Sequence, residues 1–78
     1  MPTVTLYSAP WCSYCRIAKR FLDEQQVPYT EIDVDQDEHA ARRVEQWNNG
    51  DCIIPTLDID GTIFTNPSLP QLRQVLGL

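Results

Sequence analysis

Two cysteines, Cys12 and Cys15, are the residues of this sequence best suited to carry chemistry. They are separated by Ser13 and Tyr14 in the order Cys-x-x-Cys. A cysteine thiolate can attack a disulfide, and a second thiol within reach can then attack the mixed disulfide that forms. Zinc sites and short structural disulfides share this spacing. The structural context of the pair must therefore decide between these chemistries.

A predicted strand precedes the pair and a predicted helix follows it. Residues 3–7 alternate apolar and polar side chains, which is typical of a strand. After Pro10, apolar residues recur at helical spacing, which predicts a helix from Cys15 to about Gln25. The buried face of that helix is expected to carry Ile17, Ala18, Phe21 and Leu22. A Cys-x-x-Cys at this junction is typical of thioredoxin-like redox motifs.

This position assigns different roles to the two thiols. The sulfur of Cys12 is expected near the unpaired amides and the positive dipole end of the helix, where a thiolate is stabilised. Arg16 adds positive charge close by and is a candidate for attracting an anionic ligand. Cys15 lies one turn further on, inside the helix and towards the core. We therefore expect Cys12 to be the attacking nucleophile and Cys15 the less exposed, less acidic resolving thiol.

The rest of the chain predicts further strands at 29–34, 56–59 and 62–65. The last two flank Asp60-Gly61, which suits a tight type I′ hairpin turn. A second helix is expected to start at a capping box of Asp35 and Glu38 and to end at Asn49-Gly50. A third helix opens at Ser68, ends at Gly77 and is expected to bury Leu69, Leu72, Val75 and Leu76. The order βαβαββα predicts an α/β fold with a four-stranded mixed sheet flanked by three helices.

Composition and length restrict the function. The 78 residues suffice for a single domain, 1–78, and the net charge of −5 argues against a nucleic-acid partner. There is neither a signal-peptide pattern nor an apolar run that could span a membrane, so a cytoplasmic location is expected. Thiols are kept reduced there, and three cysteines indicate redox chemistry or metal binding before structural disulfides.

A zinc site can be counted from Cys12, Cys15, His39 and Cys52. His39, however, falls in the first turn of an acidic helix, and there is no second cysteine pair. We therefore expect no metal and read His39 as a solvated residue. Cys52 is either a third reactive thiol or an inert small apolar residue, and the second interpretation is favoured.

The chain resembles the glutaredoxins over nearly its whole length. The motifs that carry the resemblance are Trp11-Cys12-Ser13-Tyr14-Cys15, Ile54-Pro55-Thr56, Asp60-Gly61 and the short closing helix. The segment Thr65-Asn66-Pro67-Ser68 is similar to the mycoredoxin branch of that family. The resemblance implies a thioredoxin fold and a thiol-disulfide oxidoreductase that needs no bound cofactor.

The resemblance also implies a substrate site. Ile54-Pro55 is expected to be a cis peptide facing the cysteines, with the Ile54 backbone pairing to the incoming peptide or thiol. Tyr14 is expected to flank the bound thiol, and Trp11 to cover the thiolate or merely fill the loop. Ser68 is expected to cap the last helix, and together with Thr65 it is a candidate ligand contact.

The choice of cosubstrate follows from one segment in which this sequence differs from the usual glutaredoxin pattern. Glutaredoxins usually carry a Gly-Gly-Cys-Asp-like stretch that binds glutathione, and Thr65-Asn66-Pro67-Ser68 replaces it here. Loss of the acidic residue removes a partner for an α-amino group, which favours mycothiol over glutathione as the low-molecular-weight thiol. The expected partners are disulfide-containing or S-thiolated proteins, the small thiol and a reductase system, with the chain acting as a monomer.

Three other functions stay open at this point. The chain could be a thioredoxin-like electron donor to ribonucleotide reductase, a metal or iron-sulfur carrier, or a non-catalytic adaptor. Reduction by thioredoxin reductase would favour the first. Bound zinc or visible absorbance would favour the second, and cysteines unreactive towards alkylation would favour the third.

Overall fold

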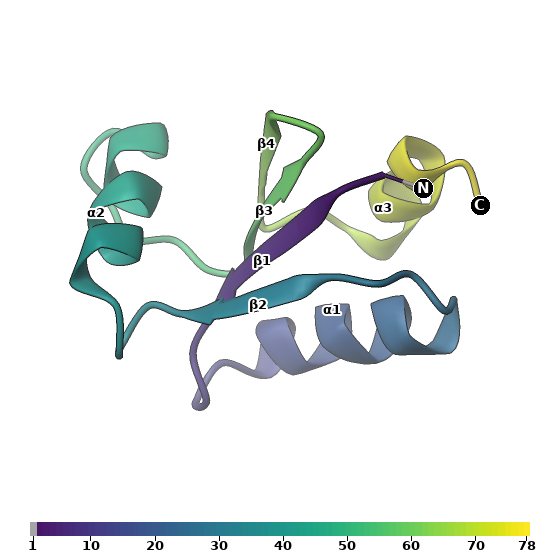
Figure 1. Cartoon of the computed structure of the whole chain (residues 1–78), viewed down its shortest axis with the longest axis horizontal. Helices are drawn as coiled ribbons and strands as arrows, with labels where there is room; N and C mark the ends of the chain where they lie inside the picture. The colour runs from purple at the N-terminus through teal and green to yellow at the C-terminus, as the bar shows by residue number, and fades with distance from the viewer. Residues whose placement is uncertain (1) are drawn as a thin grey trace.

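The computed structural model describes residues 2–78, and its elements follow the predicted order βαβαββα (Figure 1). The strands are β1 Val4–Ser8, β2 Thr30–Asp33, β3 Thr56–Ile59 and β4 Thr62–Thr65. The helices are α1 Ser13–Glu24, α2 Glu38–Trp47 and α3 Leu69–Leu76. The predicted α/β class with a four-stranded mixed sheet and three helices is confirmed.

The sheet has the strand order β2-β1-β3-β4. The edge strand β2 pairs in parallel with β1, and the crossover between them contains α1. The other two pairings, β1 with β3 and β3 with β4, are antiparallel. The β3–β4 turn has φ of 52° at Asp60 and 90° at Gly61, as a type I′ hairpin requires. The motif after β1 therefore emerges from a central strand.

Helices cover both faces of the sheet. Helices α1 and α3 share one face and α2 covers the other, as Figure 1 shows with α2 standing apart from the other two. The first face has the larger buried cluster, made of Val4, Leu6, Phe21, Leu22, Val27, Leu57, Ile59 and Leu72. The α2 face has Tyr7, Ala9, Val34, Ala40 and Val44. Because α1 and α3 pack on the same face, their exposed sides form a continuous surface next to the cysteine motif.

The predicted start of α2 was wrong by two residues. Asp37, and not Asp35, is the N-cap, and its side chain accepts a hydrogen bond from the Ala40 amide at 3.0 Å. A turn comes first, in which the Asp33 carboxylate accepts from the amide of Asp35 at 2.9 Å. This local side-chain hydrogen bond competes with helix formation at Asp35, so the helix starts further along the chain.

Apolar periodicity overestimated the buried faces of α1 and α3. Leu72 is fully buried and Leu76 partly buried, but Leu69 is 36% and Val75 38% exposed. Ile17 on α1 is 48% exposed. Helix α3 has only 8 residues and touches the core along a narrow line, so its outer apolar positions stay at the surface.

Replacing the α2 cap tests this boundary. Asp37→Ala is expected to lower the free energy of unfolding by about 1 kcal/mol, because the Ala40 amide loses its acceptor. Asp37→Asn keeps an acceptor and is the matched control, expected to lie within about 0.3 kcal/mol of the parent chain. Urea unfolding measures both. A larger loss in Asp35→Ala than in Asp37→Ala would place the cap at Asp35.

Candidate active site

Cys12 is the N-cap of α1, at the point where the chain leaves β1. Its extended backbone, with φ of −87° and ψ of 110°, directs the side chain back over the first helical turn. The amide of Cys15 donates a hydrogen bond to Cys12 Sγ at 3.1 Å. A sulfur at this position is stabilised as an anion by the donated N–H and by the positive end of the helix dipole. The predicted position of the Cys12 sulfur near the first amides of the helix is therefore present.

Cys15 is the more deeply buried of the two thiols. Its side chain is 0% exposed, against 6% for Cys12, and both cysteines are free thiols. Burial, followed by the hydrogen bond to Cys12, raises the pKa of Cys15 to about 12. Cys15 is therefore protonated at neutral pH. The burial and weak acidity predicted for Cys15 are present in the structure, and its role as the resolving thiol stays a prediction.

The loop before β3 faces the nucleophile. The Ile54-Pro55 peptide is cis, as the resemblance implied, and the Ile54 carbonyl oxygen lies 3.9 Å from Cys12 Sγ. Pro55 is buried, and its carbonyl accepts from the amide of Asn66 at 2.7 Å. This bond fixes the proline loop to the segment after β4. Backbone groups of Ile54 are thus placed beside the sulfur, where an extended substrate could pair with them.

A groove of about 340 Å³ adjoins the cysteine motif, and we term it the thiol groove. It brings together Tyr14, Pro55 and Ser68, three residues predicted to bind substrate. The sequence did not predict the other lining residues, Ile17, Ala18, Asn66, Pro67 and Leu69. Ser68 also caps α3, since its Oγ accepts from the Gln71 amide at 3.2 Å. No lining residue carries a charged side chain.

The structure places the remaining predicted contacts outside the thiol groove. Trp11 is 68% exposed, and its Nε1 donates to an Asp35 carboxylate oxygen at 2.8 Å. Arg16 donates to the Pro10 carbonyl at 3.3 Å and lines a different groove. The hydroxyl of Thr65 donates to the side-chain oxygen of Asn48. Their roles in substrate binding remain predictions.

Cys52 and His39 are not among the residues that line the thiol groove. Both are exposed, and partial burial followed by the carboxylates of Glu45 and Asp35 raises the pKa of Cys52. A raised pKa keeps this thiol protonated and slow to react at neutral pH. Within residues 2–78, no group of three or more His, Cys, Asp or Glu side chains is placed to hold a metal ion. No helix in the same range is long and apolar enough to cross a membrane.

The fold and the site together define a thiol-disulfide oxidoreductase of the thioredoxin fold. The observations that define it are a Cys-x-x-Cys at the start of a helix, a first cysteine whose sulfur caps that helix and a cis-proline loop beside this sulfur. Residues 4–64 match the family described as Glutaredoxin.

Comparison with individual proteins supports the same family. The chain is 48% identical to mycoredoxin 1 of Corynebacterium glutamicum, over 86% of this chain and 84% of the relative. It is 38% identical to a glutaredoxin of Neisseria meningitidis, over 100% of this chain and 93% of the relative. The crystal structure of a glutaredoxin from Methanosarcina mazei has the same fold, with a TM-score of 0.82 over 97% of this chain and 79% of that one, at 23% identity.

The chain belongs to the glutaredoxin family. It acts as a thiol-disulfide oxidoreductase through the motif of Cys12 and Cys15, with a low-molecular-weight thiol as cosubstrate and disulfide proteins as partners. The resemblance predicted from the sequence is confirmed.

Alkylation should separate the three thiols. A thiol with a pKa of about 12 is ionised in only about one molecule in 10⁵ at pH 7, so Cys15 should stay unmodified until the pH approaches that value. We expect one equivalent of iodoacetamide to modify Cys12 first, with Cys52 slower, as peptide mass mapping would show. Modification of Cys15 as fast as Cys12 in the native protein would contradict this assignment.

Proposed function

We propose that Cys12 is the catalytic nucleophile of a mycothiol-dependent reduction of mixed and protein disulfides. The observation that supports it best is the hydrogen bond from the Cys15 amide to Cys12 Sγ, in a motif whose Tyr14 lines an uncharged groove. This contact stabilises the anion that must attack, on a sulfur that lies 3.9 Å from the Ile54 carbonyl oxygen and two residues before Tyr14 of the groove lining.

The reaction proceeds in two exchanges. The Cys12 thiolate attacks a sulfur of the substrate disulfide, a bond forms between these two sulfurs, and the other substrate sulfur leaves as a thiolate. The resulting mixed disulfide is resolved by Cys15 or by a second molecule of the small thiol. Resolution by Cys15 produces the Cys12–Cys15 disulfide and requires that the Cys15 proton leave, because that thiol is neutral at neutral pH.

The lining of the thiol groove supports mycothiol as the cosubstrate. Mycothiol is an acylated cysteine on a hydroxyl-rich pseudodisaccharide and has no ionised group besides its thiol. Glutathione has an α-amino group and two carboxylates, each of which needs a charged or strongly polar partner. The groove offers hydroxyls of Tyr14 and Ser68 and the amide of Asn66, but no charge. Such groups match hydroxyls, and the 48% identity to a mycoredoxin agrees.

Single-cysteine variants test the assigned roles. Cys15→Ser should retain activity on mixed disulfides, because a second small thiol can resolve Cys12, and should lose activity on protein disulfides. Cys12→Ser should lose both activities by about 10³-fold or more, since Cys15 is buried with a pKa of about 12 and the pKa of Cys52 is raised. Assays on a mixed disulfide and on a protein disulfide measure this. Turnover retained by Cys12→Ser would refute the assignment of Cys12 as the nucleophile.

A charge placed in the thiol groove tests the choice of cosubstrate. The parent chain should reduce mycothiol mixed disulfides with a higher kcat/KM than glutathione ones. Ser68→Asp keeps a helix N-cap and adds a carboxylate that can pair with the α-amino group of glutathione. We expect it to raise the glutathione-to-mycothiol ratio of kcat/KM by about tenfold.

Ser68→Asn is the matched control for that variant. Asparagine also caps helices and has nearly the same size, but it adds no charge, so the parent preference should persist. Equal efficiency of the parent chain with both thiols, or an unchanged ratio in Ser68→Asp, would contradict the assignment of mycothiol. The experiment separates the choice of thiol from the disulfide chemistry, which all three chains should retain.

A further inference from the structure

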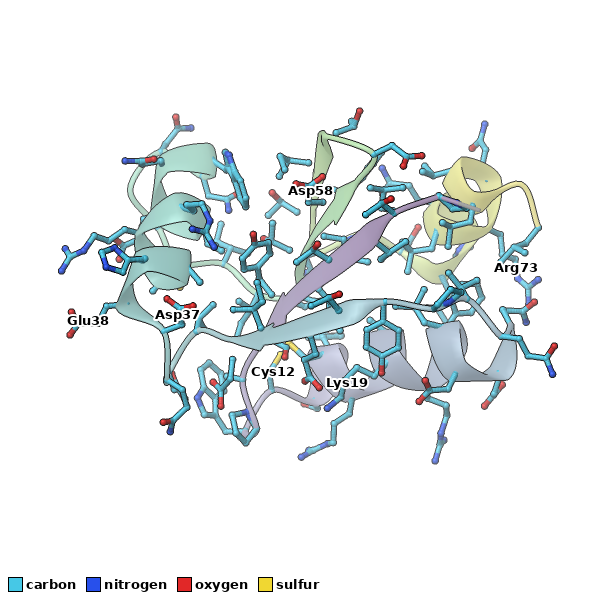
Figure 2. The ribbon with its side chains drawn as sticks, viewed as in Figure 1. Cys12, Lys19, Asp37, Glu38, Asp58 and Arg73 are labelled. Atoms are coloured by element: carbon cyan, nitrogen blue, oxygen red, sulfur yellow. The ribbon has the colours of Figure 1, made fainter. Side chains whose placement is uncertain are left out.

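A second groove, larger than the first, lies between α1 and α3. It has a volume of about 520 Å³, and we term it the arginine groove. Three arginines line it, Arg16 and Arg20 from α1 and Arg73 from α3, with apolar surface from Ile17, Phe21 and Leu69 between them. Figure 2 shows Arg73 on α3, far from Cys12 at the start of α1. The groove therefore extends away from the cysteine motif.

The positive charge of this groove is unusual in an acidic chain. The net charge is −5, with six Lys and Arg in all, so half of the basic residues line this one groove. Elsewhere, two of the other three basic side chains form ion pairs, Lys19 with Glu31 and Arg42 with Glu38. Within residues 2–78, none of the three groove arginines pairs with a carboxylate.

The contacts of the arginines keep their charge available. Arg16 donates only to the neutral Pro10 carbonyl, and the Arg73 guanidinium lies 5.2 Å from the centre of the Phe21 ring. Such contacts position a guanidinium without neutralising it. Glu24 is the one carboxylate that lines the groove, so its lining has a net charge of +2. An anionic segment with some apolar surface would complement it.

The arginine groove continues into the thiol groove. Ile17 and Leu69 line both, and these side chains are 48% and 36% exposed. Helix α1 rises about 1.5 Å per residue, so Arg20 lies about 12 Å along the axis from Cys12, a span of about four extended residues. A polypeptide whose disulfide reaches Cys12 can thus place nearby residues against the arginines.

We propose that the arginine groove docks an acidic segment of the client polypeptide, a few residues from the cysteine whose disulfide is reduced. This inference rests on the proposed function, since it assigns the client side of the same site. Small neutral disulfides occupy the thiol groove alone and gain nothing from the arginines. Acidic clients gain affinity and faster association through charge complementarity.

Two peptides and two charge-matched variants test the docking surface. The peptides carry one cysteine in a mixed disulfide, flanked within six positions by Asp and Glu or, in the second peptide, by Asn and Gln. Arg20→Gln combined with Arg73→Gln removes two charges from the groove and keeps much of the side-chain length. Arg42→Gln combined with Arg43→Gln removes the same charge from α2, outside the groove.

Two readouts are needed. Fluorescence anisotropy measures binding of dye-labelled forms of the two peptides with Ser in place of Cys, and kcat/KM measures turnover of the mixed disulfides. We expect the parent chain to prefer the acidic peptide by about tenfold at low salt in both readouts. The preference should vanish in the groove variant, persist in the α2 variant and weaken as salt is added.

Other results overturn the proposal. Equal binding of both peptides by the parent chain would show that the groove has no preference for acidic segments. The same loss of preference in both double variants would show that the preference depends on overall charge and not on the groove. A parent chain that dimerises in sedimentation experiments, with the dimer lost only in the groove variant, would assign the groove to a second copy. Acidic-peptide binding without turnover of any disulfide would instead refute the proposed function and leave the docking surface standing.

Discussion

The amide of Cys15 donates a hydrogen bond to Cys12 Sγ, and this contact makes the start of α1 and the reactive centre one structure. The other two helices begin with oxygen acceptors, at Asp37 and Ser68. A neutral thiol is a weak acceptor, whereas a thiolate accepts a strong, charge-assisted hydrogen bond. The residue that caps α1 is therefore also the residue to which the proposed function assigns the attack on the substrate disulfide.

The position of Cys15 in the helix sets the opposite character of the second thiol. Three residues after the N-cap, its side chain turns towards the core, with 0% exposure and a pKa raised to about 12. Its backbone amide supports the first sulfur while its side chain is held neutral. In the proposed function, the neutral form does not compete with Cys12 for an incoming disulfide. Cys15 attacks only after Cys12 is bound to substrate and the Cys15 proton can leave.

Local signals predicted most of the fold, and tertiary contacts account for what they missed. The bounds of β3 and β4 were predicted without error because Asp60-Gly61 fixes its turn locally. The α2 cap was assigned to Asp35, although Asp33 holds that residue in a preceding turn. In the site, the cysteine pair was evident from spacing and Tyr14 from the family motif. Asn66, by contrast, joins the thiol groove through β4 and its bond to Pro55, a contact that sequence spacing does not encode.

Two of the three wrongly assigned core residues connect the two grooves. Ile17 and Leu69 satisfy the apolar periodicity of α1 and α3, yet both residues are exposed at the surface and line both grooves. Exposed apolar side chains gain free energy when a ligand covers them, about 25 cal/mol for each Å² removed from water. In the proposed function Ile17 and Leu69 form an apolar surface that both the small thiol and the client polypeptide contact. Neutral hydrogen-bonding groups lie on one side of this surface and arginines on the other. The two grooves would then select different partners. The uncharged thiol groove discriminates among small thiols, and the positively charged arginine groove discriminates among polypeptides.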